Sequence, residues 1–209
     1  MRRIFDMNNP FMRALGIAFD LIALNVLTLV CCIPIVTGGA AITAMNDIVI
    51  HTVRGEETYL IKPFFRSFKA NFKKGTILWL MILVAAALLY FDYYAAVAYI
   101  PILRYGIAAI AVIVLAVVLY AFALLARYEN TLKGTLKNAA ILMVTNFPRT
   151  LGMVVISLGL WILAIHFYNI GAPLLLLFGL SLPCYICALF LNPVFKKLEP
   201  EQDDEPEET

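Results

Sequence analysis

Long apolar stretches separated by short polar segments dominate the hydropathy pattern of this chain. The five most apolar stretches are 15–33, 76–99, 107–126, 150–168 and 172–191, and their only charged side chains are Asp20 and Asp92. Each is long enough, as a helix, to cross a hydrocarbon core of roughly 30 Å. Helices satisfy their own backbone hydrogen bonds in lipid. The pattern therefore predicts an all-α polytopic membrane protein.

A sixth segment, 35–53, is apolar overall but contains several polar side chains. If it stays outside the membrane, five crossings place the N-terminus and the basic segment 54–74 on opposite sides, against the positive-inside bias. If it crosses, fifteen of the sixteen Lys and Arg residues fall on one side and Arg104 alone on the other. We therefore expect six transmembrane helices in three hairpins, at about 15–33, 35–53, 76–99, 107–126, 150–168 and 172–191, with both termini cytoplasmic.

Composition agrees with a membrane location. Charged residues make up 14% of the 209 residues and hydrophobic ones 63%, whereas soluble domains carry roughly 25% charged residues. The net charge of +2 is unevenly distributed, because segment 199–209 holds seven acidic residues and no base. Such a segment cannot bury enough apolar surface to fold alone. We expect one transmembrane domain, 1–198, and a disordered acidic tail, 199–209.

Two of the polar segments are predicted to form amphipathic cytoplasmic helices, at about 58–74 and 131–147. In the first, basic residues recur at spacings of 4, 3 and 4, and phenylalanines occupy the adjacent face; the basic residues are Lys62, Arg66, Lys69 and Lys73. In the second, Lys133 and Lys137 accompany an apolar stripe. Basic and aromatic residues together are typical of a helix at an anionic membrane surface. A soluble partner's groove or plain packing explains them as well.

The two amphipathic segments also align with each other at an offset of 75 residues. Lys62 aligns with Lys137, and Asn71-Phe72 aligns with Asn146-Phe147. The alignment suggests an internal repeat in which an amphipathic helix precedes a transmembrane hairpin.

Polar residues within the predicted spans are the candidates for a binding site, because burying them in lipid costs free energy. Asp47 and His51 are four residues apart and share one helical face, and Asn46 and Thr43 lie near that face. With Asn25 on the partner helix, these residues would bind a proton or a polar solute near the membrane midplane. Alternatively, they form hydrogen bonds that fix helix packing.

Signatures of catalysis and metal binding are not found. Glu56-Glu57 resembles the E-E-x-x-x-R motif of intramembrane prenyl-protein proteases, but Ile61 stands where the arginine would be, so we read Glu56 as the start of a solvated loop. Cys184 and Cys187 have a C-x-x-C spacing without further ligands nearby, and packing is the expected role. We expect no enzyme, cofactor, metal site or nucleic-acid partner.

Several short motifs together resemble the YesL family of bacterial membrane proteins. They are Phe11, Leu24-Asn25, Pro34-Ile35-Val36-Thr37-Gly38, Thr43-Ala44, Phe64-Phe65-Arg66-Ser67-Phe68-Lys69-Ala70-Asn71-Phe72, Arg127-Tyr128 and Leu136-Lys137-Asn138-Ala139. The resemblance runs from about residue 5 to residue 195. It implies a bacterial cell-membrane protein without established activity, encoded beside carbohydrate uptake systems and sensor kinases. An accessory role with such a transporter or kinase follows; a small-solute transport component is the alternative. Gly39-Ala40 replaces a common Gly-Pro, from which we expect a more flexible turn.

Overall fold

The computed structural model describes residues 10–56, 60–100, 102–166 and 168–198, and the secondary structure of these residues is helical. The helices are α1 (Pro10–Cys31), the short 3₁₀ helix η2 (Ile35–Thr37), α2 (Gly38–Arg54), α3 (Ile61–Tyr99), α4 (Leu103–Arg127), α5 (Leu132–Thr145), α6 (Phe147–His166), α7 (Tyr168–Phe178) and α8 (Ser181–Leu198). The all-α fold expected from the sequence is confirmed for this part of the chain.

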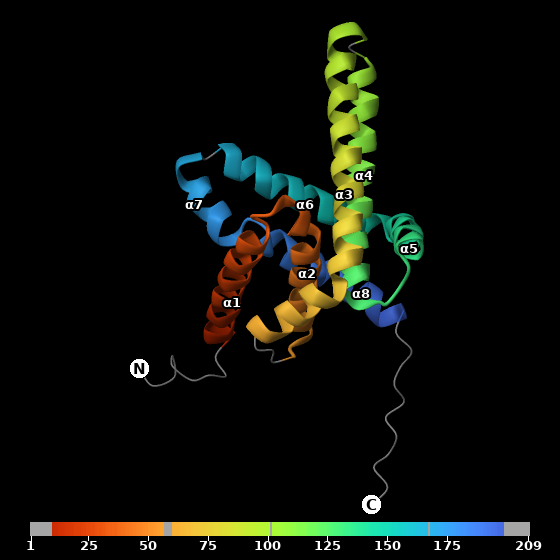
Figure 1. Ribbon diagram of the computed structural model, residues 1–209. Helices are drawn as coiled ribbons and strands as arrows, with labels where there is room; N and C mark the ends of the chain where they lie inside the picture. The colour runs from red at the N-terminus through yellow and green to blue at the C-terminus, as the bar shows by residue number, and fades with distance from the viewer. Residues whose placement is uncertain (1–9, 57–59, 101, 167, 199–209) are drawn as a thin grey trace, which may run out of the picture.

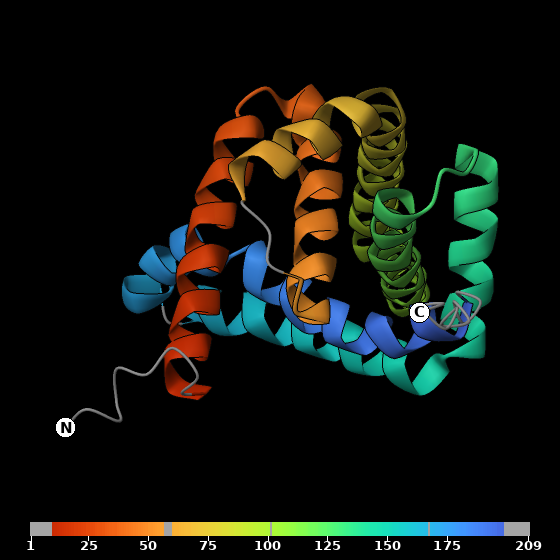
Figure 2. The same ribbon diagram turned by 90° about the horizontal axis from the view of Figure 1, so that it is seen from below.

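The helices run in several directions. Figure 1 shows the α3–α4 hairpin lengthwise, projecting beyond the other helices, and Figure 2 shows the same hairpin end-on. The antiparallel α1–α2 pair is seen lengthwise in Figure 2, so this pair runs at a steep angle to the hairpin. Helices α6 and α8 run across α1 and α2. The described residues thus do not form one bundle of parallel hairpins.

Helix α3 joins two segments that the sequence separates into a surface helix at 58–74 and a span at 76–99. It is one helix of 39 residues, whose first part runs beside α2 before the helix turns into the projecting hairpin (Figures 1 and 2). In the second half of the proposed repeat, α5 and α6 are instead bent by 101°. Pro148 stands in α6 where Lys73 stands in α3. A proline ring clashes with the carbonyl four residues earlier, which explains why only the second copy breaks.

Hydrogen bonds at the bend between α5 and α6 satisfy the helix ends. The Asn146 side-chain amide donates to the Leu142 carbonyl at 3.3 Å, and the Thr150 hydroxyl donates to the Met143 carbonyl at 2.9 Å. Thr150 is buried and also contacts the Tyr120 hydroxyl of α4 at 3.0 Å. The bend is therefore fixed to the core through α4.

The predicted span 172–191 is also interrupted. Helix α7 ends at Phe178 and α8 begins at Ser181, so this stretch is two short helices rather than one. A Cβ at Gly179 would lie 2.3 Å from the Leu175 carbonyl oxygen. Glycine is therefore the residue that fits the turn between them.

Within the residues that the structure describes, three helices are long and apolar enough to cross a membrane: Ala14–Cys31, Ile61–Val97 and Leu103–Arg127. A fourth crossing is added if the bent α5–α6 pair counts as one span. The residues of the projecting part of the hairpin are largely exposed and apolar, for example Val84, Leu88 and Phe91. Exposed apolar surface of this extent marks a membrane or protein contact. These helices make the chain a multi-pass membrane protein.

Helices α2 and α3 cross at a very close backbone contact. A Cβ added at Gly39 would lie 2.1 Å from the Gly75 carbonyl oxygen, and one added at Gly75 would lie 3.0 Å from the Gly39 carbonyl oxygen. Trp79 covers the start of α2, and its indole nitrogen donates to the Ile35 carbonyl at 2.9 Å. Small residues let membrane helices approach this closely. Gly39 and Ala40 therefore stand in the first turn of a packed helix, not in the turn where they were expected.

We predict that Gly39→Ala destabilises the protein. The added methyl group meets backbone, which cannot rotate away, so α2 and α3 must separate; overpacking of this kind costs about 1–3 kcal/mol. Gly16→Ala is the control, because a Cβ there meets nothing within 4 Å, and it should raise the free energy of unfolding by up to about 1 kcal/mol. Thermal unfolding in detergent measures both. Equal melting temperatures for the two variants would contradict the crossing.

Candidate functional site

Three titratable side chains meet where α2 ends. Gly55 terminates the helix with φ of 78°, in the left-handed region, and its N–H donates to the carbonyls of His51 and Thr52. The next N–H, of Glu56, donates to the His51 carbonyl at 3.2 Å. This is the hydrogen-bonding pattern of a glycine C-cap. It turns the chain back so that the Glu56 side chain reaches the imidazole of His51.

His51 lies between two carboxylates. Its Nε2 is 3.6 Å from Oδ1 of Asp47, one turn earlier in α2, and its Nδ1 contacts Oε2 of Glu56. The side chains of Asp47 and His51 are 23% and 29% exposed. The contact with Glu56 is a hydrogen bond, whereas the distance to Asp47 is longer than a hydrogen bond. The imidazole therefore links the end of the helix to the loop that follows it.

No hydrogen bond joins the other predicted site residues to this cluster in the part of the chain that the structure describes. The Thr43 hydroxyl donates to the Gly39 carbonyl at 2.7 Å, and the Asn46 amide donates to the Ile42 carbonyl at 2.9 Å, both within α2. Asn25 bonds to α7 and α8 instead. Of the five residues predicted to form a binding site, Asp47 and His51 are the pair whose side chains contact each other.

Glu56 is the member of the cluster that the sequence analysis missed. Its partner His51 is five residues earlier, whereas side chains share a helical face when they are three or four residues apart. The available signal is Gly55, because a glycine directly after a helical pattern is a typical helix stop that reverses the chain.

Asn25 fixes the junction between α7 and α8. Its side chain is fully buried; the amide donates to the Leu176 carbonyl at 2.8 Å, and the amide oxygen accepts from the N–H groups of Leu180 at 2.8 Å and Ser181 at 3.1 Å. The first N–H groups of a helix have no partner within the helix. Asn25 supplies one for α8 from a different helix, so α1 stabilises the interruption of the apolar stretch.

The predicted basic stripe forms the outer face of the first part of α3. Phe64 is fully buried and Ser67 is nearly so, which turns the opposite side of the helix outward. The outward residues are Lys62, Phe65, Arg66, Lys69, Phe72 and Lys73, all exposed. No ion pair joins the four basic ones to another described residue. We call these six residues the basic face.

The expectation that the phenylalanines of this helix share one face is wrong. They lie on two sides of the helix, Phe64 and Phe68 on one and Phe65 and Phe72 on the other. Phe64 and Phe68 stack inside, with ring centroids 6.4 Å apart, whereas Phe65 and Phe72 are each 42% exposed. The inner pair anchors the helix to the core, and the outer pair accompanies the cations.

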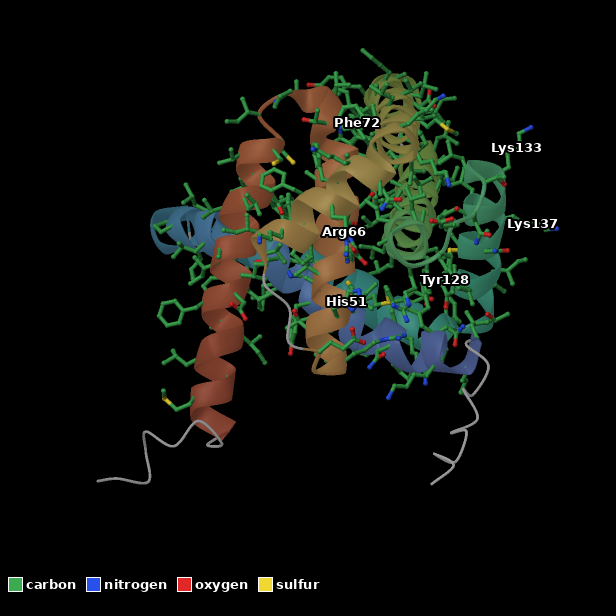
Figure 3. All side chains as sticks on the ribbon, turned by 60° about the horizontal axis from the view of Figure 1, so that its bottom comes forward. His51, Arg66, Phe72, Tyr128, Lys133 and Lys137 are labelled. Atoms are coloured by element: carbon green, nitrogen blue, oxygen red, sulfur yellow. The ribbon has the colours of Figure 1, made fainter. Side chains whose placement is uncertain are left out.

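The basic residues of α5 form a separate surface. Figure 3 shows Lys133 and Lys137 projecting from α5 away from the rest of the molecule, whereas Arg66 lies on the first part of α3, near the middle of the view. The two halves of the proposed repeat therefore present their lysines in different directions.

The remaining candidates are not gathered into a site. Cys187 is buried and its sulfur is 3.5 Å from the Ser157 hydroxyl. Within the described residues, no three His, Cys, Asp or Glu side chains come together in a way that would hold a metal ion.

These features define a helical membrane protein with a basic amphipathic surface. Residues 21–93 match a family described as protein of unknown function, DUF624. The YesL family carries this domain, so the resemblance seen in the sequence is confirmed over these residues. The matched residues include the α2–α3 crossing, the His51 cluster and the basic face. No curated protein and no solved structure matches the chain.

We predict that Asn25→Ala lowers the free energy of unfolding by about 2 kcal/mol. The change removes the side-chain partner of three backbone groups at the α7–α8 junction, those of Leu176, Leu180 and Ser181. Asn138→Ala is the matched control: Asn138 is exposed on α5, and the change should stay within about 0.5 kcal/mol. Chemical or thermal unfolding of the purified protein compares the two. If both variants are as stable as the parent, Asn25 does not hold the junction.

Proposed function

We propose that this protein is an accessory component of carbohydrate uptake or sensing in the bacterial cell membrane. It has no catalytic activity of its own and acts by contact. The observation that carries the proposal is the basic face, which is exposed, is free of ion pairs to described residues, and belongs to the same helix as a candidate membrane span.

The composition of the basic face suits a contact at the headgroup level of the membrane. Lys and Arg extend their charged ends to phosphate while their stems cover apolar surface, and each one near an anionic surface contributes about 1 kcal/mol. The exposed rings of Phe65 and Phe72 add apolar contact beside them. An acidic surface of a partner protein offers the same complementarity.

The carbohydrate role and the partners rest on the YesL resemblance. Its members are encoded beside carbohydrate uptake systems and sensor kinases, so subunits of such a transporter or kinase are the proposed partners. A small-solute site around Asp47 is less well supported. Thr43 and Asn46 donate to backbone carbonyls of α2, and Asn25 donates to α7.

The proposed topology keeps the six crossings expected from the sequence, with both termini in the cytoplasm. It therefore adds two or three crossings to the helices that qualify by length and apolarity. The distribution of basic residues supports it. In addition, α1 begins, and α2, α4 and α8 end, on the side of the molecule opposite the α3–α4 turn (Figure 1). Arg104 is at that turn, in contact with Tyr105.

We predict that replacing Lys62, Arg66, Lys69 and Lys73 by Gln leaves membrane insertion intact but weakens partner capture. Affinity purification from native membranes in mild detergent should recover less of the co-purifying transporter or kinase subunits. The control replaces four exposed lysines elsewhere, Lys133, Lys137, Lys196 and Lys197, and should leave recovery unchanged. Undiminished capture by the first variant would refute a docking role of the basic face.

The topology can be tested by labelling single cysteines, each introduced into a variant that lacks Cys31, Cys32, Cys184 and Cys187. In intact cells, a membrane-impermeant thiol reagent should label Ile102→Cys at the α3–α4 turn and Val36→Cys in η2, and should not label Lys133→Cys. Val36 and Ile102 are both exposed. Protection of Val36→Cys together with labelling of Ile102→Cys would mean that the α1–α2 pair does not cross.

A further inference from the structure

A groove of about 980 Å³ lies between α1 and the start of α3. Six of its lining residues are apolar: Ala23, Val26, Leu27, Val30, Leu60 and Ile61. The volume is at the upper end of the roughly 300–1,000 Å³ that small-molecule sites occupy. Its α1 wall belongs to a helix apolar enough to cross the membrane. In a membrane, this wall would contact acyl chains rather than water.

Two charges of opposite sign complete the lining. Asp20 belongs to the α1 wall and Lys62 to the α3 wall. Both are exposed, and no ion pair or hydrogen bond joins either to another described residue. A carboxylate on an apolar helix surface needs a cationic or donor partner. Lys62 does not supply it, and an occupant of the groove with a cationic group would.

We infer that this groove binds one zwitterionic phospholipid with a primary-amine headgroup, of the phosphatidylethanolamine type. The acyl chain lies along the apolar walls, the phosphate accepts from Lys62, and the ammonium donates to Asp20. Each charge on the protein then meets its opposite, and both contacts are charge-assisted hydrogen bonds. A purely anionic lipid would satisfy Lys62 and leave Asp20 beside a negative headgroup.

The inference does not rest on the carbohydrate role. It concerns the lipid ligand of the α1–α3 groove, whereas the docking proposal concerns the whole basic face. Of the basic face, Lys62 alone lines the groove, so Asp20 and Val26 test the groove without any change to the basic face.

The test uses the intact purified chain, delipidated in detergent, and native mass spectrometry with phosphatidylethanolamine, phosphatidylcholine and phosphatidylglycerol of identical acyl chains. The parent should retain one phosphatidylethanolamine about tenfold more strongly than phosphatidylglycerol, the ratio that about 1.4 kcal/mol represents. Phosphatidylcholine, which keeps the positive charge but lacks N–H donors, should rank between them. Equal retention of the three lipids, or retention of none, would overturn the inference.

Variants then assign the two contacts. Asp20→Asn should lower the retention of phosphatidylethanolamine to that of phosphatidylglycerol. Asp20→Glu should keep the stronger retention of phosphatidylethanolamine. Lys62→Gln and the groove-filling Val26→Trp should weaken the retention of both lipids. Lys196→Gln, at an exposed position of α8 outside the groove and the basic face, should weaken the retention of neither. A preference that survives Asp20→Asn in a folded protein would contradict the assignment. The lipid series with the parent tests the inference even if a variant fails to fold.

Discussion

The contact on which the rest of the fold depends is the crossing of α2 and α3 at Gly39 and Gly75. Backbone touches backbone there, and any side chain would force the helices apart. The close approach brings Phe64 into the core, and burying Phe64 turns the basic side of α3 outward. The orientation of the basic face is therefore set by two residues that have no side chain and carry no charge.

The sequence predicted the helical, membrane-spanning character of the chain well, because apolar runs are long and charges are few. It predicted helix continuity poorly, because continuity depends on single residues. Lys73 allows α3 to run through the point where Pro148 breaks the second copy. The turn at Gly179 divides a stretch whose apolar character is uniform. Hydropathy does not distinguish these cases, whereas backbone sterics do.

The candidate site was predictable in part, for a similar reason. The four-residue spacing of Asp47 and His51 is a local property of a helix and was visible in the sequence. The contact of Glu56 with His51 depends on the left-handed conformation of Gly55. The hydrogen bonds of Asn25 depend on residues about 150 positions later in the chain. Spacing identifies neighbours within one helix, but neighbours that come from a turn or a distant helix are fixed by the tertiary fold.

The bonds of Asn25 also impose an order on biogenesis. A chain is synthesised from its N-terminus, so α1 is complete long before Leu176, Leu180 and Ser181 have left the ribosome. Throughout this interval the amide of Asn25 lacks the backbone groups that it binds in the finished protein. The joining of α1 to the α7–α8 junction can accordingly be completed only after Ser181 has been synthesised, when helices α2 to α7 have already been made.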